Sequence, residues 1–161
     1  MNIASEQVWA ALAGVPDPEI PAISIVDLGI VRGVECSEGH VRITVTPTYS
    51  GCPATEMIRA DICAAVASLG VSSVEVDTQL VPAWTTDWLS PATRARLKDY
   101  GIVPPATNAD GSQTIHFHSR IRCPRCNSTE VEEISAFGST ACKALHRCLA
   151  CREPFEYFKP I

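Results

Sequence analysis

Hydrophobic and polar positions follow two different periods along the chain, and each period predicts its own kind of element. Apolar and polar side chains alternate, with the period of two that turns one face of a strand inward, over residues 41–46 and 73–81, and residues 30–36 are expected to form a further strand ahead of the first of these. Apolar residues three and four apart, typical of a helix with one buried face, occur over residues 5–13 and 53–69. The order helix, hairpin, helix, strand predicts an α+β fold, a small mixed sheet with one layer of helices.

Cap and turn residues sharpen these boundaries. Ser5 is a suitable cap for the first helix, and the segment Ser37-Glu38-Gly39-His40 is short enough for a hairpin turn. Ser90 followed by Pro91 predicts one more helix, ending at Lys98 or Tyr100 before a glycine.

Two further segments of this part of the chain leave the regular pattern. Three prolines exclude regular structure over residues 16–21, and the apolar residues that follow favour an ordered turn over a loose linker. Trp84 and Trp88 are four residues apart, so they suit either a platform for a partner or a core edge, and we favour the core.

Composition and charge divide the chain into two modules. Small polar residues over 106–113 predict a linker between a first domain, 1–105, and a second module, 114–161. The first domain holds 6 Lys+Arg against 12 Asp+Glu, and residues 106–161 hold 7 against 6. This balance argues against a nucleic-acid binder, and the cluster of Arg120, Arg122 and Arg125 is better interpreted as a solvated face or a contact with the acidic first domain.

The general composition indicates a globular, cytoplasmic protein. With 46% hydrophobic and 19% charged residues among 161, the chain has enough apolar side chains for a core. It shows no apolar run of membrane-spanning length, and its first residues lack the basic and apolar order of a signal peptide. In a reducing compartment its eight cysteines indicate metal or redox chemistry rather than disulfides.

The second module carries the strongest motif. Cys123-Pro-Arg-Cys126 and Cys148-Leu-Ala-Cys151 are two CxxC pairs separated by 21 residues, a spacing that matches a zinc ribbon. Four cysteines close the coordination of Zn²⁺, which predicts a structural site whose metal binding supplies folding energy. Iron in the same cage would give an electron carrier, and the sequence leaves that alternative open.

Other residues of the second module are weaker candidates. Cys142 suits an exchangeable ligand, a reactive thiol or a small buried residue, and we favour the last. His116 and His118 fall on one side of a possible strand, where a half-exposed face is a simpler interpretation than a metal site.

The first candidate for chemistry in the first domain is the loop Thr48-Tyr49-Ser50-Gly51-Cys52-Pro53. Pro53 suits the first helical position, so Cys52 is expected to cap the central helix. Unpaired amides and the helix dipole favour an anion there, which predicts a thiol pKa below its ordinary value. A small buried residue is the structural alternative. A thiol enzyme is a weaker hypothesis, because neither His40 nor His146 can be placed near Cys52 as a base.

With these motifs in hand, the first domain resembles the SufT-type iron-sulfur assembly family. The likeness runs through Asp17-Pro-Glu-Ile-Pro21, Ile25-Val-Asp-Leu-Gly29, Thr44-Val-Thr46 and Gly51-Cys52-Pro53. The second module is similar to the zinc ribbon of the PaaD family of phenylacetate-degradation proteins, and the likeness rests on Phe137-Gly-Ser-Thr140 and Cys142-Lys143-Ala144. Proteins of this family are counted among the components of the ring-1,2-phenylacetyl-CoA epoxidase.

The resemblance implies a role in iron handling rather than oxygenation. It assigns Cys52, Asp17 and Glu19 to the transient binding of iron or an iron-sulfur cluster, while Asp27 is interpreted as a turn or capping residue. Glu-x-x-His pairs of a di-iron bundle and a GxGxxG fingerprint are both absent from the sequence.

The resemblance therefore implies that the chain is an accessory protein, which matures an oxygenase or reductase component of the epoxidase. The accessory protein is expected to act as a homodimer or docked to its partner. A redox component with iron in the four-cysteine cage is the alternative. Whether the chain itself catalyses a reaction stays open.

Overall fold

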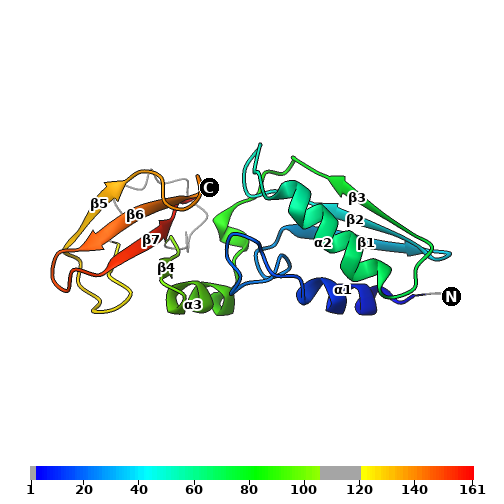
Figure 1. The fold of residues 1–161 in the computed structure, drawn as a ribbon, viewed down its shortest axis with the longest axis horizontal. Coiled ribbons are helices and arrows are strands. Elements are labelled where there is room, and N and C mark those ends of the chain that lie inside the picture. The colour runs from blue at the N-terminus through cyan, green and yellow to red at the C-terminus, as the bar shows by residue number, and fades with distance from the viewer. Residues whose placement is uncertain (1–2, 106–120) are drawn as a thin grey trace. The chain divides into compact units, whose positions relative to one another are not determined.

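The computed structural model describes residues 3–105 and 121–161 of the chain. These residues form two compact units, an N-terminal unit, Met1–Trp84, and a C-terminal unit, Thr85–Ile161 (Figure 1). The predicted linker 106–113, together with Arg120 and the two histidines His116 and His118, lies outside the described residues. Among the residues that the structure describes, no helix has the length and apolar character needed to cross a membrane.

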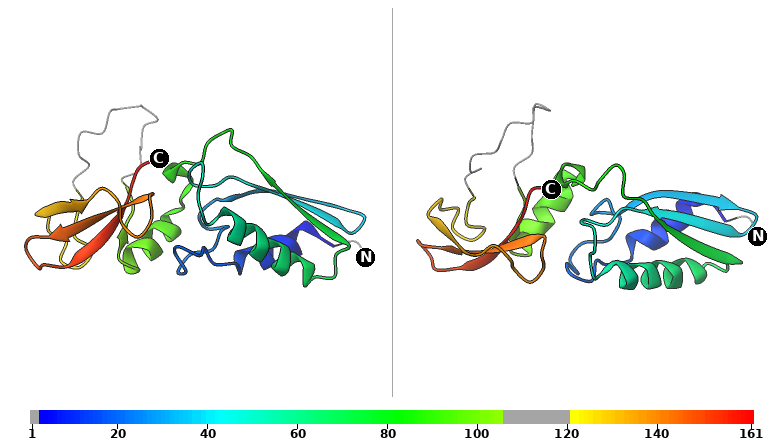
Figure 2. Two further views of the ribbon diagram at one scale, coloured as in Figure 1. Left: turned by 45° about the horizontal axis from the view of Figure 1, so that its top comes forward. Right: turned by 90° about the horizontal axis from the view of Figure 1, so that it is seen from above.

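The N-terminal unit is a three-stranded mixed sheet covered on one face by two helices (Figures 1 and 2). Its elements follow in the order α1 (Ser5–Ala13), β1 (Val31–Ser37), β2 (His40–Val45), α2 (Thr55–Ala67) and β3 (Ser73–Thr78). β1 pairs with β2 antiparallel and β2 pairs with β3 parallel, so α2 is the crossover between two parallel strands. This confirms the α+β fold class that the sequence predicts.

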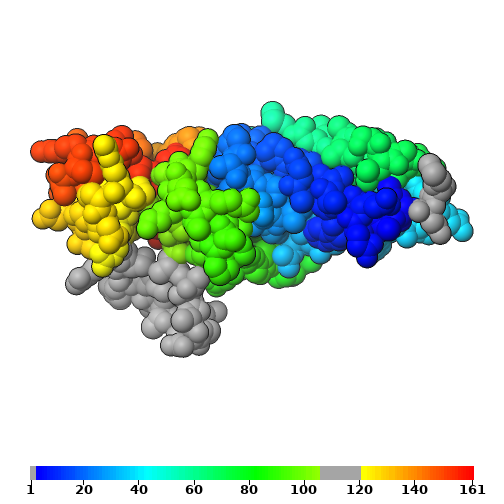
Figure 3. All heavy atoms as spheres, turned by 90° about the horizontal axis from the view of Figure 1, so that it is seen from below, coloured from blue at the N-terminus to red at the C-terminus, as the bar shows by residue number. Residues whose placement is uncertain are grey.

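The two periods in the sequence account for the core of this unit. Val41, Ile43 and Val45 of β2 point towards the helices and are at most 3% exposed, while the residues between them lie on the open face. Ile58, Ile62 and Val66 of α2 form the facing stripe. The space-filling view shows α1, in dark blue, as an outer layer of this unit (Figure 3).

The segment between α1 and β1 is ordered, as its apolar density predicts. Ile20, Ile23 and Ile25 are at most 2% exposed, although only an isolated bridge, between Pro16 and Ser24, supplies regular pairing. Asp27 caps its own turn, because its carboxylate accepts bonds from the amide and hydroxyl of Ser24. Prolines and side-chain caps therefore replace secondary structure here.

Of the two tryptophans, Trp84 is a core residue, as the sequence analysis favours. Trp84 is 2% exposed and donates its indole N–H to the carbonyl of Leu28 at 2.8 Å. Trp88 is half-buried and lies in the other unit.

The C-terminal unit is built on a four-stranded sheet in the order β4-β7-β6-β5 (Figure 1). Its elements are η1 (Thr86–Trp88), α3 (Pro91–Asp99), β4 (Ile102–Val103), β5 (Val131–Ser135), β6 (Lys143–Cys148) and β7 (Pro154–Phe158). Ser90 caps α3 as predicted, accepting a bond from the Thr93 amide at 3.0 Å.

The division between the two units lies some twenty residues before the domain end placed at 105 by the sequence analysis. The reason is pairing: β4 joins the edge of the ribbon sheet beside β7, and the carbonyl of Ile161 accepts a bond from the Thr86 amide. Arg94 of α3 further connects this segment by donating to the carbonyls of Pro105, Thr86 and Leu89. Residues 85–105 therefore belong to the same unit as the ribbon.

Candidate functional site

The four cysteines of the C-terminal unit lie on two loops of matching geometry. In the first loop the amide of Cys123 bonds the Ser128 carbonyl at 2.9 Å, and in the second the amide of Cys148 bonds the Glu153 carbonyl at 2.9 Å. Each loop closes through a residue with positive φ, Asn127 at 59° and Arg152 at 65°. The CxxC motifs thus form two equivalent knuckles.

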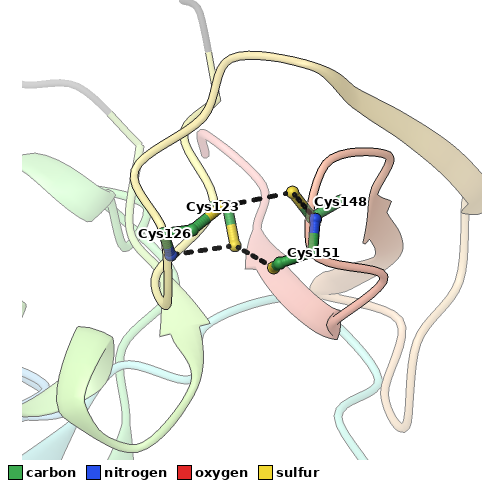
Figure 4. Close-up of side chains that lie close together, drawn as sticks. All are labelled: Cys123, Cys126, Cys148 and Cys151. Carbon is green, nitrogen blue, oxygen red and sulfur yellow. Dashed lines mark hydrogen bonds between the residues drawn. The ribbon is translucent and has the colours of Figure 1, made fainter.

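The knuckles bring their sulfurs to one point, as Figure 4 shows. The sulfurs of Cys123 and Cys151 are 3.6 Å apart, those of Cys126 and Cys148 are 3.5 Å apart, and all four lie within 4.8 Å of one another. A tetrahedron with metal–sulfur distances of about 2.3 Å has sulfur–sulfur edges of about 3.8 Å. The amides of Cys126 and Cys151 each point to the first sulfur of their own knuckle at 3.5 Å. The cage therefore suits a tetrahedral metal ion.

Electrostatics in the cage also favour a cation. The Cys151 amide stabilises the thiolate of Cys148 and lowers its pKa to about 7. The Ser128 amide favours ionisation of Cys126 too, but hydrogen bonds with the neighbouring sulfurs outweigh it and raise the pKa of Cys126 to about 12. Four thiolates cannot gather at one point without a positive charge among them, and a divalent metal supplies it.

The cage is half enclosed. Cys123 and Cys148 are fully buried and pack with Phe155, whereas Cys126 is exposed and Cys151 is half-buried. Because four protein sulfurs fill a tetrahedron, a metal held here has no open position for a substrate.

The second candidate is the loop that carries Cys52, and here the sequence prediction needs a correction. α2 begins at Thr55 with Ala54 as its cap residue, so Cys52 is not the cap and Pro53 is not the first helical residue. The Cys52 carbonyl accepts bonds from the amide and the hydroxyl of Thr55, at 3.2 and 2.8 Å, which forms a separate turn ahead of the helix. The first helical bond runs from Ile58 to Ala54.

The predicted direction of the Cys52 pKa is also wrong. Burial of the half-buried thiol is the largest cause and raises its pKa above the ordinary value. The Ala54 amide and the Tyr49 side chain favour the thiolate but do not outweigh burial, and the negative charges of Glu19 and Asp17 raise the pKa further. The fold therefore places Cys52 within the electrostatic range of both carboxylates.

The two carboxylates differ in what they contact. Asp17 is 5% exposed, and its Oδ1 accepts bonds from the amides of Glu19 and Ile20, both at 2.9 Å. Asp17 therefore shapes the proline-rich turn. Glu19 is only partly buried, so its carboxylate is the more accessible of the two.

The C-terminal unit holds polar residues that sequence reasoning did not select. Lys143 is almost fully buried and pairs with Glu156 at 2.9 Å. His146 is 5% exposed and stacks on Phe155 with ring centroids 5.8 Å apart. The buried lysine has no signature in the sequence, because only the fold brings it against a carboxylate 13 residues further along.

Cys142 is the small buried residue that the sequence analysis favoured. It is 5% exposed, with the Thr140 hydroxyl 3.0 Å from its sulfur.

Two protein families match the chain, one on each part. Residues 5–77 match the family described as iron-sulfur cluster assembly protein, a range that contains Asp17, Glu19 and Cys52. Residues 107–159 match the family described as PaaD zinc beta ribbon domain, which contains all four cage cysteines.

Individual relatives cover either nearly the whole chain or about half of it. The putative D subunit of the 1,2-phenylacetyl-CoA epoxidase of Escherichia coli is 54% identical over 96% of this chain and 92% of its own length. An Fe-S protein maturation auxiliary factor of Porphyromonas gingivalis is 37% identical over 53% of this chain and 82% of its own length. In structure, a domain of unknown function from Bacillus anthracis superposes with a TM-score of 0.54 at 30% identity, covering 57% of this chain and 89% of that one.

Proposed function

This chain belongs to the family of the phenylacetyl-CoA epoxidase D subunits, and on that premise we propose that it is a maturation protein for the epoxidase. In this role it assists the insertion of iron or an iron-sulfur cluster into a component of the enzyme. The match of residues 5–77 to iron-sulfur cluster assembly proteins supports an accessory role, and the likeness to an Fe-S maturation factor supports it as well.

One observation carries the proposal: the Cys52 thiol lies in the field of two carboxylates, on a loop ahead of a helix. Sulfur and carboxylate oxygen are both ligands that iron accepts. Glu19 is the partly exposed carboxylate and takes the role of second ligand, while Asp17 holds the turn and adds negative charge. Iron is cargo here, and the chain holds it only in transit.

The raised pKa of Cys52 suits transient binding. At neutral pH the thiol stays protonated, so it resists oxidation better than a thiolate would. The carboxylates attract a cation, and the cation in turn favours loss of the thiol proton. Binding is thereby coupled to proton release, and a partner that removes the metal lets the thiol take its proton back.

The ligand set at Cys52 is incomplete, because a cluster needs about four protein ligands. The remaining ligands come from the receiving protein or from a second copy of the chain. Cytoplasmic maturation of the oxygenase or reductase component fits this requirement.

The four-cysteine cage takes Zn²⁺ in this proposal. Cys123, Cys126, Cys148 and Cys151 hold it, and the metal supplies folding energy to a ribbon whose strands are short. The match to a zinc beta ribbon family supports zinc.

Replacement of Cys52 with Ser tests the proposal. The epoxidase components are produced with either the wild-type chain or this variant, and iron bound to each purified component is counted. The expected result is an iron-poor component beside the variant and normal loading beside Cys63→Ser, a matched control, because Cys63 is an equally half-buried cysteine on α2. Full loading and activity beside the Cys52 variant would refute the role.

A second candidate function is a redox component with iron in the cage. The exposure of Cys126 favours it, because an iron ion behind an exposed sulfur lies near the surface where electrons transfer. A visible spectrum of anaerobically purified protein decides between the metals: Zn²⁺ gives no absorption, whereas iron gives colour that bleaches on reduction.

A further inference from the structure

The topology of the N-terminal unit brings several segments to one end of its sheet. Because β2 and β3 are parallel, their carboxyl ends lie at the same edge, and α2, the crossover between them, begins there. The Gln79 amide bonds the Val45 carbonyl, so the chain leaves β3 beside the residue that leads into the Cys52 loop. Figures 1 and 2 show both segments leaving the sheet at this end.

The large apolar side chains that the N-terminal unit exposes also gather at this end. Among its described residues they are Met57 at 57%, Leu80 at 57% and Val81 at 81% exposure. Met57 lies in the first turn of α2 and the other two directly follow β3. We call these three residues the apolar patch. Clustered exposed apolar side chains are typical of interaction sites, whereas scattered ones are ordinary.

Charge indicates what kind of surface covers the patch. The N-terminal unit contains 3 Lys+Arg and 10 Asp+Glu, a net charge of -7. Glu56, next to Met57, is exposed, and Glu19 is partly exposed near Cys52. Two copies facing each other through this end would bring like charges together, so a second copy is a poor occupant. A basic partner surface is attracted instead.

We propose that this end of the N-terminal unit is the docking surface for the metal-receiving protein. The partner covers the apolar patch with an apolar contact of its own, surrounds it with Lys or Arg side chains, and presents its own metal ligands to Cys52. This inference rests on the proposed function, because the incomplete ligand set at Cys52 is what requires a partner to reach the loop.

The arrangement explains why binding and transfer coincide. A partner that covers Met57, Leu80 and Val81 excludes water from the end of the sheet that holds the Cys52 loop, which strengthens electrostatic contacts there. The patch supplies affinity and the acidic residues supply orientation and speed of encounter.

Charge reversal at the patch tests the proposal. In the patch variant, Met57, Leu80 and Val81 are all replaced with Glu. In the control variant, the exposed Ile134 and Phe137 of the C-terminal unit are replaced with Glu, at 51% and 65% exposure. All five side chains are exposed, so both variants are expected to fold, which circular dichroism verifies.

The probes are the purified oxygenase and reductase components of the epoxidase, each prepared without metal and immobilised for binding measurements. We expect at least one component to bind the wild type, the patch variant to bind at least about tenfold more weakly, and the control variant to bind as the wild type does. Raising NaCl from about 50 to about 500 mM is expected to weaken wild-type binding, since a basic partner surface loses its attraction when charges are screened.

The proposal is overturned if neither component binds the wild type, if the patch variant binds unchanged, or if the control variant alone loses binding. It is also overturned if sedimentation shows a wild-type dimer that the patch variant abolishes, because the patch is then an interface between copies. Cys52→Ser separates this inference from the proposed function. This variant is expected to bind the same component as the wild type and with the same affinity, and loss of loading without loss of binding supports both.

Discussion

The buried ion pair of the ribbon gives the sharpest prediction for a single substitution, Glu156→Gln. Lys143 has a side chain only 2% exposed, and its Nζ lies 2.9 Å from Oε2 of Glu156. The other oxygen of Glu156 accepts the Ser139 amide at 2.7 Å. A Cβ at Gly138 would lie 2.6 Å from that oxygen, so the loop is shaped around the carboxylate.

The magnitude follows from burial. Gln keeps the size of Glu, and its one oxygen can still accept the Ser139 amide. Its NH2 group then faces Lys143, so the substitution removes the charge together with the acceptor for the Lys143 ammonium. Removing one partner of a buried pair leaves an uncompensated charge and costs about 3–5 kcal/mol of unfolding free energy. Lys143→Met in the same chain removes that stranded charge, so the double variant is expected to recover most of the loss.

The assay is urea unfolding of the metal-loaded protein, followed by release of the cage metal to a coloured chelator. With a denaturant slope of about 1–3 kcal/mol per M, the loss moves the midpoint down by at least about 1 M. Glu132→Gln is the matched control. It breaks the exposed pair with Arg147 on the same sheet, worth about 0–1 kcal/mol. Equal midpoints for Glu156→Gln and Glu132→Gln would refute the reasoning.

The same pair gives the pH dependence of the ribbon. Burial raises the pKa of Glu156, but the Ser139 amide and Lys143 outweigh it and hold the pKa below its ordinary value of 4.5. A carboxyl with a depressed folded pKa stabilises the fold above its unfolded pKa. That contribution is expected to fade as the pH falls below 4.5, and Glu156→Gln is expected to remove this acid sensitivity.

Two further predictions concern the candidate sites. The rate of Cys52 alkylation by iodoacetamide, followed by mass spectrometry across pH, is expected to rise with a midpoint above that of a free thiol. Glu19→Gln is expected to lower this midpoint, and the exposed Glu56→Gln is expected to leave it unchanged. An unmoved midpoint in Glu19→Gln would contradict the assigned electrostatics. Removal of the cage metal by a chelator is expected to abolish hydrogen-exchange protection in β5, β6 and β7, while β1 to β3 stay protected. The reason is that structural zinc contributes about 10–16 kcal/mol of binding free energy to folding. Protection retained in the metal-free ribbon would contradict a structural role of the metal.

Local patterns in the sequence were sufficient for much of the fold. Alternation predicted β2 and β3, the short hairpin turn predicted β1 beside β2, and Ser90 with Pro91 predicted the start of α3. The spacing within each CxxC motif predicted the metal cage. These features depend on residues within a few positions of one another, so their geometry follows from the local chain.

The start of the central helix could not be predicted correctly from neighbouring residues alone, because α2 begins at Thr55 and not at Pro53. Pro53 suits a first helical position, yet the Thr55 side chain and amide close a turn on the Cys52 carbonyl and delay the helix. Two local preferences compete at this point, and in the fold the turn closed by Thr55 prevails over a helix start at Pro53.

The sequence by itself determined the α+β class, the four-cysteine cage and the choice of Cys52 as a candidate thiol. Only the tertiary structure decided that the Cys52 pKa is raised, that Lys143 pairs with Glu156, and that residues 85–105 join the ribbon. The physical reason is that burial and charge act through space. Their strength depends on distances between residues far apart in the chain, and those distances exist only once the chain has folded.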